Sequence, residues 1–371
     1  MMEIQEARNE ILETDKAIAA LFARRMAAVK EIAAYKKERG LPVLDKAQEE
    51  KSLQSHAAWI EDPELLPFYL QFHQDVMDVA KRYQHRLMDG LRVAYSGVEG
   101  AFAHIAAKRI FPDGAPLPCG SFEEAYEKVL DGECDCAVLP IENSFAGEVG
   151  QVIDLMFRGD LFVNGVYELQ VVQNLLGTPD AALSDVRTVV SHPQALGQCS
   201  NYIRRHGFEA KEAVNTARAA QAVAEGGDRS VAAIASAETA ELYGLRVLDH
   251  DINESKANTT RFAVFSRTAN RPAASKDSTF LLLFTVNHVA GALAKAINAI
   301  GQHGFNMKVL RSRPMKTLAW KYYFYVEAEG DITSDEGKRM IGDLSEHCLM
   351  LKIAGHYVAG ENILLDGGFE S

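Results

Sequence analysis

The chain begins with a long run that contains neither proline nor glycine. Residues 3–38 lack both helix breakers, and Gly40-Leu41-Pro42 follows, so the sequence predicts one continuous helix. Steps of four and three residues along it trace a single stripe on which apolar and charged side chains alternate. A fold with this element must either solvate these charges or use them. The charged members of the stripe are Arg8, Asp15, Arg25 and Lys36.

Two explanations of the charged stripe remain open. Either the basic stems run along a core and keep their ends in water, or Arg8, Arg25 and Lys36 line a pocket for an anion. At about 1.5 Å rise per residue, Arg8 and Lys36 lie roughly 40 Å apart on a straight helix. Both reach one small ligand only if Arg8 serves the pocket of a partner protomer, so the second explanation predicts a dimer.

Composition argues against several classes of protein. The formal net charge is −12, which argues against nucleic-acid binding. The most apolar run, residues 280–284, is too short to span a membrane, and the first residues do not have the pattern of a signal peptide. The five scattered cysteines are typical of reduced thiols, and His192 has no partner at metal-ligand spacing. We therefore expect a cytoplasmic protein without metal or cofactor.

Two further helices are predicted before residue 88. One starts near Asp45 and carries Glu49 on the same face, and the other runs over residues 63–88 and carries Gln84. Helix, break, helix and long helix with basic residues inside resembles the all-helical class of chorismate mutase, over residues 1–88. The resemblance implies a site made of Arg8 from the partner, Arg25, Lys36, Asp45, Glu49 and Gln84.

The rearrangement of chorismate to prephenate needs positioning and electrostatic stabilisation rather than an acid or a metal. The resemblance implies that the arginines hold the carboxylates and that Lys36 and Gln84 stabilise the ether oxygen. Two positions depart from the family: Gln48 stands where an arginine is usual, and Ala80 where serine is frequent. A dehydratase with a degenerate mutase domain therefore stays open as an alternative.

Strands alternate with helices between residues 91 and 267, which predicts α/β layers with mostly parallel strands and a cleft between two lobes. The strand over residues 92–95 and the following Ser96–Phe102 read as strand, glycine turn and helix, a form that points backbone amides at an anion. The predicted strands are 92–95, 136–139, 188–190 and 231–234, with helices over 193–205 and 216–225.

Three polar stretches follow or begin strands of this region, so all can face one cleft. They are Leu139–Ser144, Ser191–Cys199 and Asn258–Phe262. In this order they resemble the signature of prephenate dehydratases, over residues 92–266, with a two-lobed fold like periplasmic binding proteins. The resemblance implies Thr260 and Glu142 as catalytic residues and Asn143, Ser191, Gln198 and Arg261 as substrate contacts.

In that family the ring hydroxyl leaves together with carbon dioxide, and phenylpyruvate forms. Thr260 is the expected donor to the departing hydroxyl and Arg261 the expected carboxylate clamp, unless strand alternation turns Arg261 away. Threonine is a weak acid, so Glu142 with a raised pKa is the alternative acid. Ser191 also reads as a helix N-cap. Ala101 and Ala103 stand where the family prefers hydroxyls, and arogenate in place of prephenate stays open.

Residues 278–360 read as strand, helix, two strands, helix and strand, the order of a ferredoxin-like sandwich, after a linker over 266–277. The predicted strands are 278–286, 305–311, 319–327 and 349–358, and the helices are 290–302 and 334–346. The region resembles an ACT domain, which binds phenylalanine between paired domains, although Arg311 reverses the charge usual at its position. The implied effector contacts are Gly291, Ala292, Leu293, Ser312, Arg313 and Pro314.

Together these resemblances predict a multidomain, bifunctional chorismate mutase and prephenate dehydratase that works as a homodimer or homotetramer. Chorismate and prephenate are the expected substrates, and phenylalanine is the expected effector. An amino-acid-sensing binding protein without catalysis is the alternative from another class. An intact Glu142, Thr260 and Arg261 argue against it, because a binder needs no donor beside a leaving hydroxyl.

Overall fold

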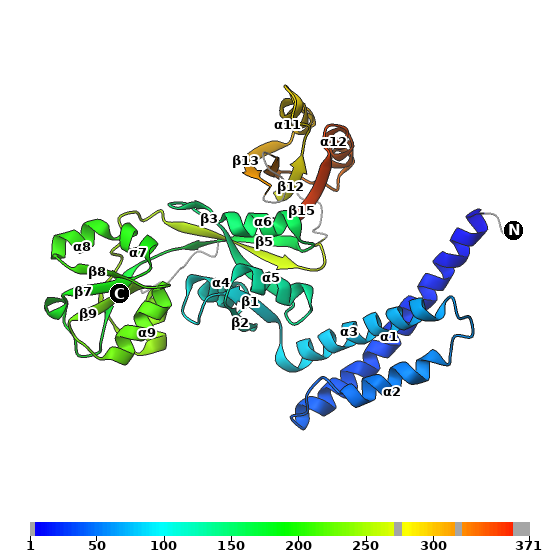
Figure 1. Ribbon diagram of the computed structural model, residues 1–371, viewed down its shortest axis with the longest axis horizontal. Helices are drawn as coiled ribbons and strands as arrows, with labels where there is room; N and C mark the ends of the chain where they lie inside the picture. Colours follow the sequence, from blue (N-terminus) through cyan, green and yellow to red (C-terminus); the bar gives the residue numbers. More distant parts are fainter. Residues whose placement is uncertain (1–3, 271–276, 316–320, 359–371) are drawn as a thin grey trace. The chain divides into compact units, whose positions relative to one another are not determined.

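The computed structural model describes residues 4–270, 277–315 and 321–358. The chain divides into two compact units, Met1–Arg92 and Val93–Ser371 (Figure 1). Of the helices in the described ranges, none is both long and apolar enough to cross a membrane.

The first unit is all-helical. The predicted continuous first helix is confirmed as α1 (Ile4–Glu38), followed by α2 (Lys46–Ala57) and α3 (Leu66–Asp89). Only the second half of α1 is covered by its own chain, through the buried Val29 and Ala33. In the first half, Ile4 and Ile11 are 71% and 61% exposed, so the described residues of one chain leave this end of the stripe uncovered.

The third helix begins at Leu66, three residues after its predicted start. Asp62 first accepts a hydrogen bond from the Glu64 amide at 2.8 Å and shapes a turn. Pro67 then stands in the first helical turn, where its missing N–H costs nothing. A helix from residue 63 would need that N–H to continue its ladder, so Pro67 sets the start.

The second unit contains a two-lobed α/β region built on two sheets. The first lobe holds β1 (Arg92–Ser96), α4 (Phe102–Ile110), β2 (Ala115–Cys119), α5 (Phe122–Leu130), β3 (Cys136–Asn143), β4 (Gly147–Glu148), α6 (Gly150–Arg158), β5 (Phe162–Gln170) and β11 (Thr259–Ser266). The second lobe holds β6 (Asn174–Gly177), the 3-10 turn η1 (Leu183–Asp185), β7 (Thr188–Ser191), α7 (Pro193–Gln198), α8 (Ser200–His206), β8 (Glu209–Glu212), α9 (Thr216–Gly226), β9 (Val231–Ala235), α10 (Ala237–Tyr243) and β10 (Arg246–Asp249).

The prediction of mostly parallel strands is wrong. The β1–β3, β7–β8 and β7–β9 pairs are parallel, but β11 runs antiparallel to both β3 and β5. The chain leaves the first lobe along β5 and returns along β11, so the returning strand must run in the opposite direction. This return is what brings Thr260 beside Asn143.

The second lobe packs helices on both faces of its sheet, with α7 and α8 on one side and α9 on the other (Figure 1). The single helix predicted over 193–205 is instead α7 and α8. Cys199 separates them with φ −114° and ψ 16°, outside the helical region, and Gly197 just before it is a poor helix former.

The C-terminal region has the predicted strand–helix order. Its elements are β12 (Ser278–Thr285), α11 (Ala292–Gln302), β13 (Asn306–Pro314), β14 (Tyr322–Glu329), α12 (Asp335–Glu346) and β15 (Met350–Val358). The strand order β13-β14-β12-β15, antiparallel throughout, is that of a ferredoxin-like sandwich. Residues 271–276 of the predicted linker, 319–320 of the third predicted strand and 359–360 at the predicted domain end lie outside the described residues.

This sandwich is joined to the first lobe rather than tethered to it. Gly355 of β15 pairs with Val163 of β5, which makes one ten-stranded sheet. A Cβ atom at Gly355 would lie 2.4 Å from the Val163 carbonyl oxygen, so only glycine permits this approach.

The apolar run over residues 280–284 is explained by the same junction. Leu281 and Leu283 face the core of the first lobe, whereas Phe280, Leu282 and Phe284 face the two helices of the sandwich. A strand covered on both faces needs apolar residues at every position. The C-terminal sheet therefore shares its core with the lobe that carries β3 and β11.

Two candidate active-site cavities

The helical unit encloses a cavity of about 470 Å³ between its three helices. Apolar side chains such as Val29 and Met77 form part of the wall. The polar and charged residues that line it are Arg25, Tyr35, Lys36, Asp45, Gln48, Glu49, Ser52, Lys81 and Gln84. Five of the six predicted mutase residues thus come together around one space.

Two buried polar atoms in this cavity have no hydrogen-bond partner among the described residues, namely Arg25 Nη1 and Gln84 Oε1. Burial of an unpaired polar atom is costly, which makes both atoms candidate ligand contacts. Lys36 Nζ donates to the Val43 carbonyl at 2.7 Å. Asp45 is the N-cap of α2 and accepts from the Gln48 amide at 3.1 Å, so its carboxylate also has a structural role.

Arg8 is the predicted residue that this cavity lacks. It lies exposed in the first half of α1 and does not line the space. Lys81 is a residue that the sequence reasoning missed. Its Nζ lies 3.1 Å from Glu49 Oε2 and 2.8 Å from Asp78 Oδ1. The signal was its place three residues before Gln84, on the same face of α3.

The charge of Lys81 is secured by its neighbours. Burial alone would lower the pKa of Lys81, but hydrogen bonds from its ammonium to Asp78 and Glu49 raise that pKa overall. The ammonium is therefore charged at neutral pH.

A second cavity, of about 500 Å³, lies between the two lobes of the α/β region. It is lined from the first lobe by Asn143 and Thr260 and from the second by Gln198 and Thr216. The other polar residues that line it are Ser96, Gln173, His192, Gln194 and Asn215. None of the described residues around it is a lysine, arginine, aspartate or glutamate.

Asn143 orients Thr260 in this cavity. Asn143 Nδ2 donates to Thr260 Oγ1 at 2.9 Å and also lies 3.0 Å from Asn258 Oδ1. Asn143 Oδ1 accepts from the Phe145 and Ala146 amides at 3.0 and 2.9 Å, which fixes the direction of the side-chain amide. Because Thr260 Oγ1 accepts from Asn143, its own proton stays available for donation.

The sequence reasoning missed two glutamines of this cavity. Gln173 Nε2 donates to Gln198 Oε1 at 3.2 Å, and Gln173 Oε1 is buried with no partner among the described residues. Gln194 Nε2 reaches Asn143 Oδ1 at 3.4 Å. Gln194 stood inside the polar stretch Ser191–Cys199, which was a usable signal, whereas Gln173 follows β5 without a motif.

Ser191 was predicted to contact the substrate, but it does not line the cavity. It is completely buried, and its hydroxyl donates to the Ile234 carbonyl at 2.6 Å, which ties β7 to β9. The N-cap of α7 is His192 instead, whose Nδ1 accepts from the Gln194 amide at 3.2 Å. The chain needs one more extended residue before Pro193 than the N-cap prediction allowed, because the residue before proline avoids helical angles.

Glu142 and Arg261 also lie outside the cavity. Successive side chains of a strand point to opposite faces, and β3 pairs with β11 so that Thr260 opposes Asn143 while Arg261 opposes Glu142. Thr260 and Asn143 therefore face the cavity, whereas Glu142 and Arg261 face the C-terminal sheet. The structure therefore does not place the predicted catalytic residue Glu142 at this cavity, and strand alternation turns the predicted carboxylate clamp Arg261 away from it.

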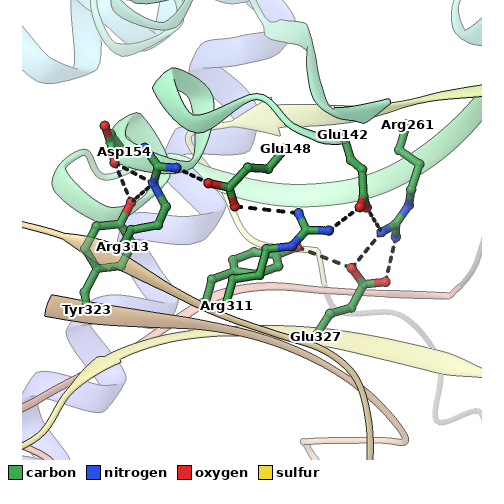
Figure 2. Close-up of polar contacts among 9 residues, drawn as sticks. Glu142, Glu148, Asp154, Arg261, Arg311, Arg313, Tyr323 and Glu327 are labelled. Carbon is green, nitrogen blue, oxygen red and sulfur yellow. Dashed lines mark hydrogen bonds and ion pairs between the residues drawn. The ribbon is translucent and has the colours of Figure 1, made fainter. Parts of the chain in front are cut away.

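Figure 2 shows where the two side chains go. Arg261 makes a two-pronged ion pair with the buried Glu327, at 3.0 and 2.6 Å, and lies 3.2 Å from Glu142. Burial works to lower the pKa of Arg261, but the hydrogen bonds and charge of Glu327 raise it above its ordinary value. The pair is thus a desolvated link between β11 and β14.

The network continues along β13 (Figure 2). Arg311 is paired with Glu142 and lies 3.9 Å from Glu148, and Arg313 is paired with Glu148. Arg313 Nε also donates to Asp154 Oδ1 at 2.9 Å, and Asp154 Oδ1 accepts from the Tyr323 hydroxyl at 2.6 Å. Acidic side chains of the first lobe thus alternate with arginines of the C-terminal sheet.

This network shows where the predicted effector residues lie. Arg311, which reverses the charge usual at its position, pairs with Glu142 and lies 3.9 Å from Glu148. Arg313 faces the first lobe, whereas Ser312 and Pro314 alternate to the exposed side of the edge strand β13. Gly291, Ala292 and Leu293 lie at the start of α11, where Gly291 is the N-cap with a φ of +80°.

Comparison with known proteins gives two family matches along the chain. The chorismate mutase type II family matches residues 7–85, and the prephenate dehydratase family matches residues 93–270. A bifunctional chorismate mutase/prephenate dehydratase of Aquifex aeolicus (strain VF5) is 28% identical over 368 residues, with 96% of this chain and 98% of the relative covered. Arogenate dehydratase 2 of Petunia hybrida is 32% identical over 287 residues, with 74% and 73% covered.

A solved structure resembles the second unit. A prephenate dehydratase of Arthrobacter aurescens in complex with L-Phe is 25% identical, with a TM-score of 0.68 over 72% of this chain and 90% of that chain. Two family models match the chain in series, and one relative is matched over nearly its full length. The chain therefore belongs to the family of bifunctional chorismate mutase/prephenate dehydratases.

Proposed function

We propose that each cavity carries one of the two reactions of this family. In the helical cavity, Arg25 binds a carboxylate of chorismate with its unpaired buried Nη1, because a guanidinium fork matches a carboxylate. Lys36 and Gln84 lie along the same wall and stabilise the ether oxygen as it gains charge. The cavity holds the substrate folded and needs no nucleophile.

In the cavity between the lobes, Thr260 donates its proton toward the departing ring hydroxyl of prephenate. The observation that carries this role is the hydrogen bond from Asn143 to Thr260 Oγ1, which leaves the Thr260 proton as the free donor. Gln173 and Gln198 contact the same space and hold the substrate. Carbon dioxide leaves as the ring becomes aromatic, so the protein mainly has to stabilise the hydroxide that departs.

Prephenate carries two carboxylates, and this cavity offers neutral donors to them. The helix α4 begins at its wall with Ala101, Phe102 and Ala103. Its N-cap, Ala101, makes no side-chain cap, so amides of the first turn are open to an anion. This geometry replaces the role that the sequence analysis gave to Arg261.

The division of labour has a direct test with Arg25→Ala. Supplied with chorismate, the variant should form little prephenate and little phenylpyruvate. Supplied with prephenate, it should form phenylpyruvate at the wild-type rate, because Thr260 and its cavity are untouched. Full mutase activity in Arg25→Ala would show that the helical cavity is not the mutase site.

The C-terminal sandwich is, in this proposal, an ACT domain that binds phenylalanine and inhibits dehydration. Its ferredoxin-like strand order supports this assignment, as does the complex of the Arthrobacter relative with L-Phe. Arg311 pairs with Glu142 on β3, directly beside Asn143. A shift of β13 on effector binding therefore reaches the strand that orients Thr260.

Calorimetry and inhibition together test this regulation. Phenylalanine should bind to wild type, to Arg311→Met and to Lys308→Met, but Arg311→Met should lose most of the inhibition. Lys308 is the matched control, because it lies on β13 and its ion pair is with Glu329 of the neighbouring strand. No heat of binding at millimolar phenylalanine and no change in rate would mean that the domain has another role. Valine at Gly291 is a poor probe, because the φ of +80° strains any β-branched residue.

The exposed half of α1 supports a homodimer or a homotetramer. Ile4 and Ile11 face solvent in one chain, and a second copy packed along α1 would cover them and bring its Arg8 to the Arg25 cavity.

A further inference from the structure

The charges around the helical cavity come from all three helices. Arg25 and Lys36 lie on α1, Glu49 lies on α2, and Lys81 lies on α3. Chorismate is a dicarboxylate, and a charged donor to each carboxylate offsets more of the cost of its leaving water than a neutral donor does. On the α2 and α3 side of the space, Gln48 is neutral, and Lys81 is the only lysine or arginine among the described residues that line it.

The contacts of Lys81 leave it able to bind a ligand. Its ammonium has three N–H donors, and two of them are directed to Asp78 and Glu49. Asp78 does not line the cavity, so it holds the ammonium from outside while Lys81 contributes to the wall. The third donor is left for a group inside the cavity.

We infer that Lys81 is a substrate-binding residue of the mutase, which binds a carboxylate of chorismate from α3 and supplies the positive charge that Gln48 does not. The inference rests on the proposed mutase site in this cavity. A purely structural role is the rival explanation, because the bond from Lys81 to Glu49 also ties α3 to α2.

The first experiment compares Lys81→Met with Lys51→Met in the full-length protein. Lys51 is a matched control, because it is an exposed lysine on α2 that does not line the cavity. Loss of a charge-assisted hydrogen bond should raise KM for chorismate about tenfold to a hundredfold in Lys81→Met. KM in Lys51→Met should stay at the wild-type value, and both variants should turn over prephenate normally.

The second experiment moves the charge instead of removing it. Gln48 lines the same cavity from α2, so Gln48→Arg combined with Lys81→Met should recover most of the lost affinity for chorismate. A tie between helices would not be restored in this way, because Asp78 would remain unpaired on α3. If KM for chorismate in the double variant stays as high as in Lys81→Met alone, the binding role of Lys81 is overturned.

The third comparison tests whether Lys81 acts only by neutralising the charge of Glu49. Removal of Lys81 leaves the Glu49 carboxylate facing a dianion, which alone would weaken binding. Glu49→Gln added to Lys81→Met removes that repulsion. If KM then equals the value for Glu49→Gln alone, Lys81 acts only on Glu49 and the inference fails. If KM stays above the value for Glu49→Gln alone, Lys81 itself binds the substrate.

Arg25→Ala separates this inference from the proposed site. If Arg25→Ala has no mutase activity and Lys81→Met has normal mutase activity, the substrate-binding role of Lys81 is rejected and the mutase site in the helical cavity is kept. Normal mutase activity in both variants would reject the helical cavity altogether.

Discussion

The two cavities have similar volumes, but one is lined by charged side chains and the other by neutral ones. The helical cavity, of about 470 Å³, is lined by Arg25, Lys36 and Lys81 as well as Glu49. The cavity between the lobes, of about 500 Å³, is lined by amides, hydroxyls and apolar groups, with no arginine, lysine or carboxylate among its described residues. Under the proposed function, one protein handles two dianionic substrates with two kinds of recognition.

The difference follows from where each reaction places its charge. In the rearrangement the substrate stays one dianion, so fixed cations can hold it and also stabilise the ether oxygen. In the dehydration a hydroxide departs, and a positioned donor such as Thr260 is needed at that atom. The first lobe does possess charges close by, but strand alternation turns Glu142 and Arg261 into the junction with the C-terminal sheet.

The largest expected effect tests the neutral donor. Thr260→Val keeps the shape of the side chain and removes its proton, and loss of such a donor should lower dehydratase kcat by about 10²–10³. Thr260→Ser should keep much more of the activity. Mutase activity, measured on the same samples, should be unaffected in both. Equal dehydratase turnover in the wild type and the valine variant would show that the donor lies elsewhere.

The next effect tests whether only the charged cavity depends on a second copy. Arg8→Ala and Lys36→Ala should each lack mutase activity while they retain dehydration. In a randomly mixed dimer population, about a quarter of all mutase sites would have both residues intact, so mixing the two variants should restore a corresponding fraction of activity. Verified mixed dimers with no recovery would contradict a shared site.

A third effect tests whether the ion pairs behind the neutral cavity support structure rather than bind substrate. Glu327→Ala removes the two-pronged partner of the desolvated Arg261 guanidinium and leaves it with the 3.2 Å contact to Glu142, which should destabilise the second unit by about 3 kcal/mol. Arg261→Met in the same chain should recover part of that loss, as measured by thermal unfolding. A change in KM for prephenate without any loss of stability would place Arg261 in substrate binding after all.

The sequence was a good guide to elements and a weaker guide to directions. The proline-free run predicted α1, and its basic stripe predicted the cavity of Arg25 and Lys36, because a helical period assigns residues to faces over many turns. The polar stretches located Asn143 and Thr260 at one cleft. Their neighbours Glu142 and Arg261 were misplaced, because a motif marks a stretch of chain whereas a strand divides it between two faces.

Other misses depended on partners that are distant in sequence. Lys81 gains its orientation from Glu49, 32 residues earlier, and Arg311 gains its acid from Glu142, 169 residues earlier. Gln173 is part of the cavity only because Gln198 and Asn253 lie against it. No local period or motif reports such contacts.

The smallest expected effect compares both cavities in one titration with salt. Screening weakens the attraction between a dianion and fixed cations, and the Debye length falls from roughly 14 Å at 50 mM to about 4 Å at 500 mM ionic strength. KM for chorismate should therefore rise about threefold or more over this range, because Arg25, Lys36 and Lys81 act through their charge. KM for prephenate should change by less than about twofold, because amides and a helix end act at short range in a partly enclosed space. A control with potassium chloride and sodium chloride separates screening from binding of a particular cation. A steeper salt dependence for prephenate than for chorismate would mean that dehydration relies on charges such as Arg261, and the contrast between the two cavities would fail.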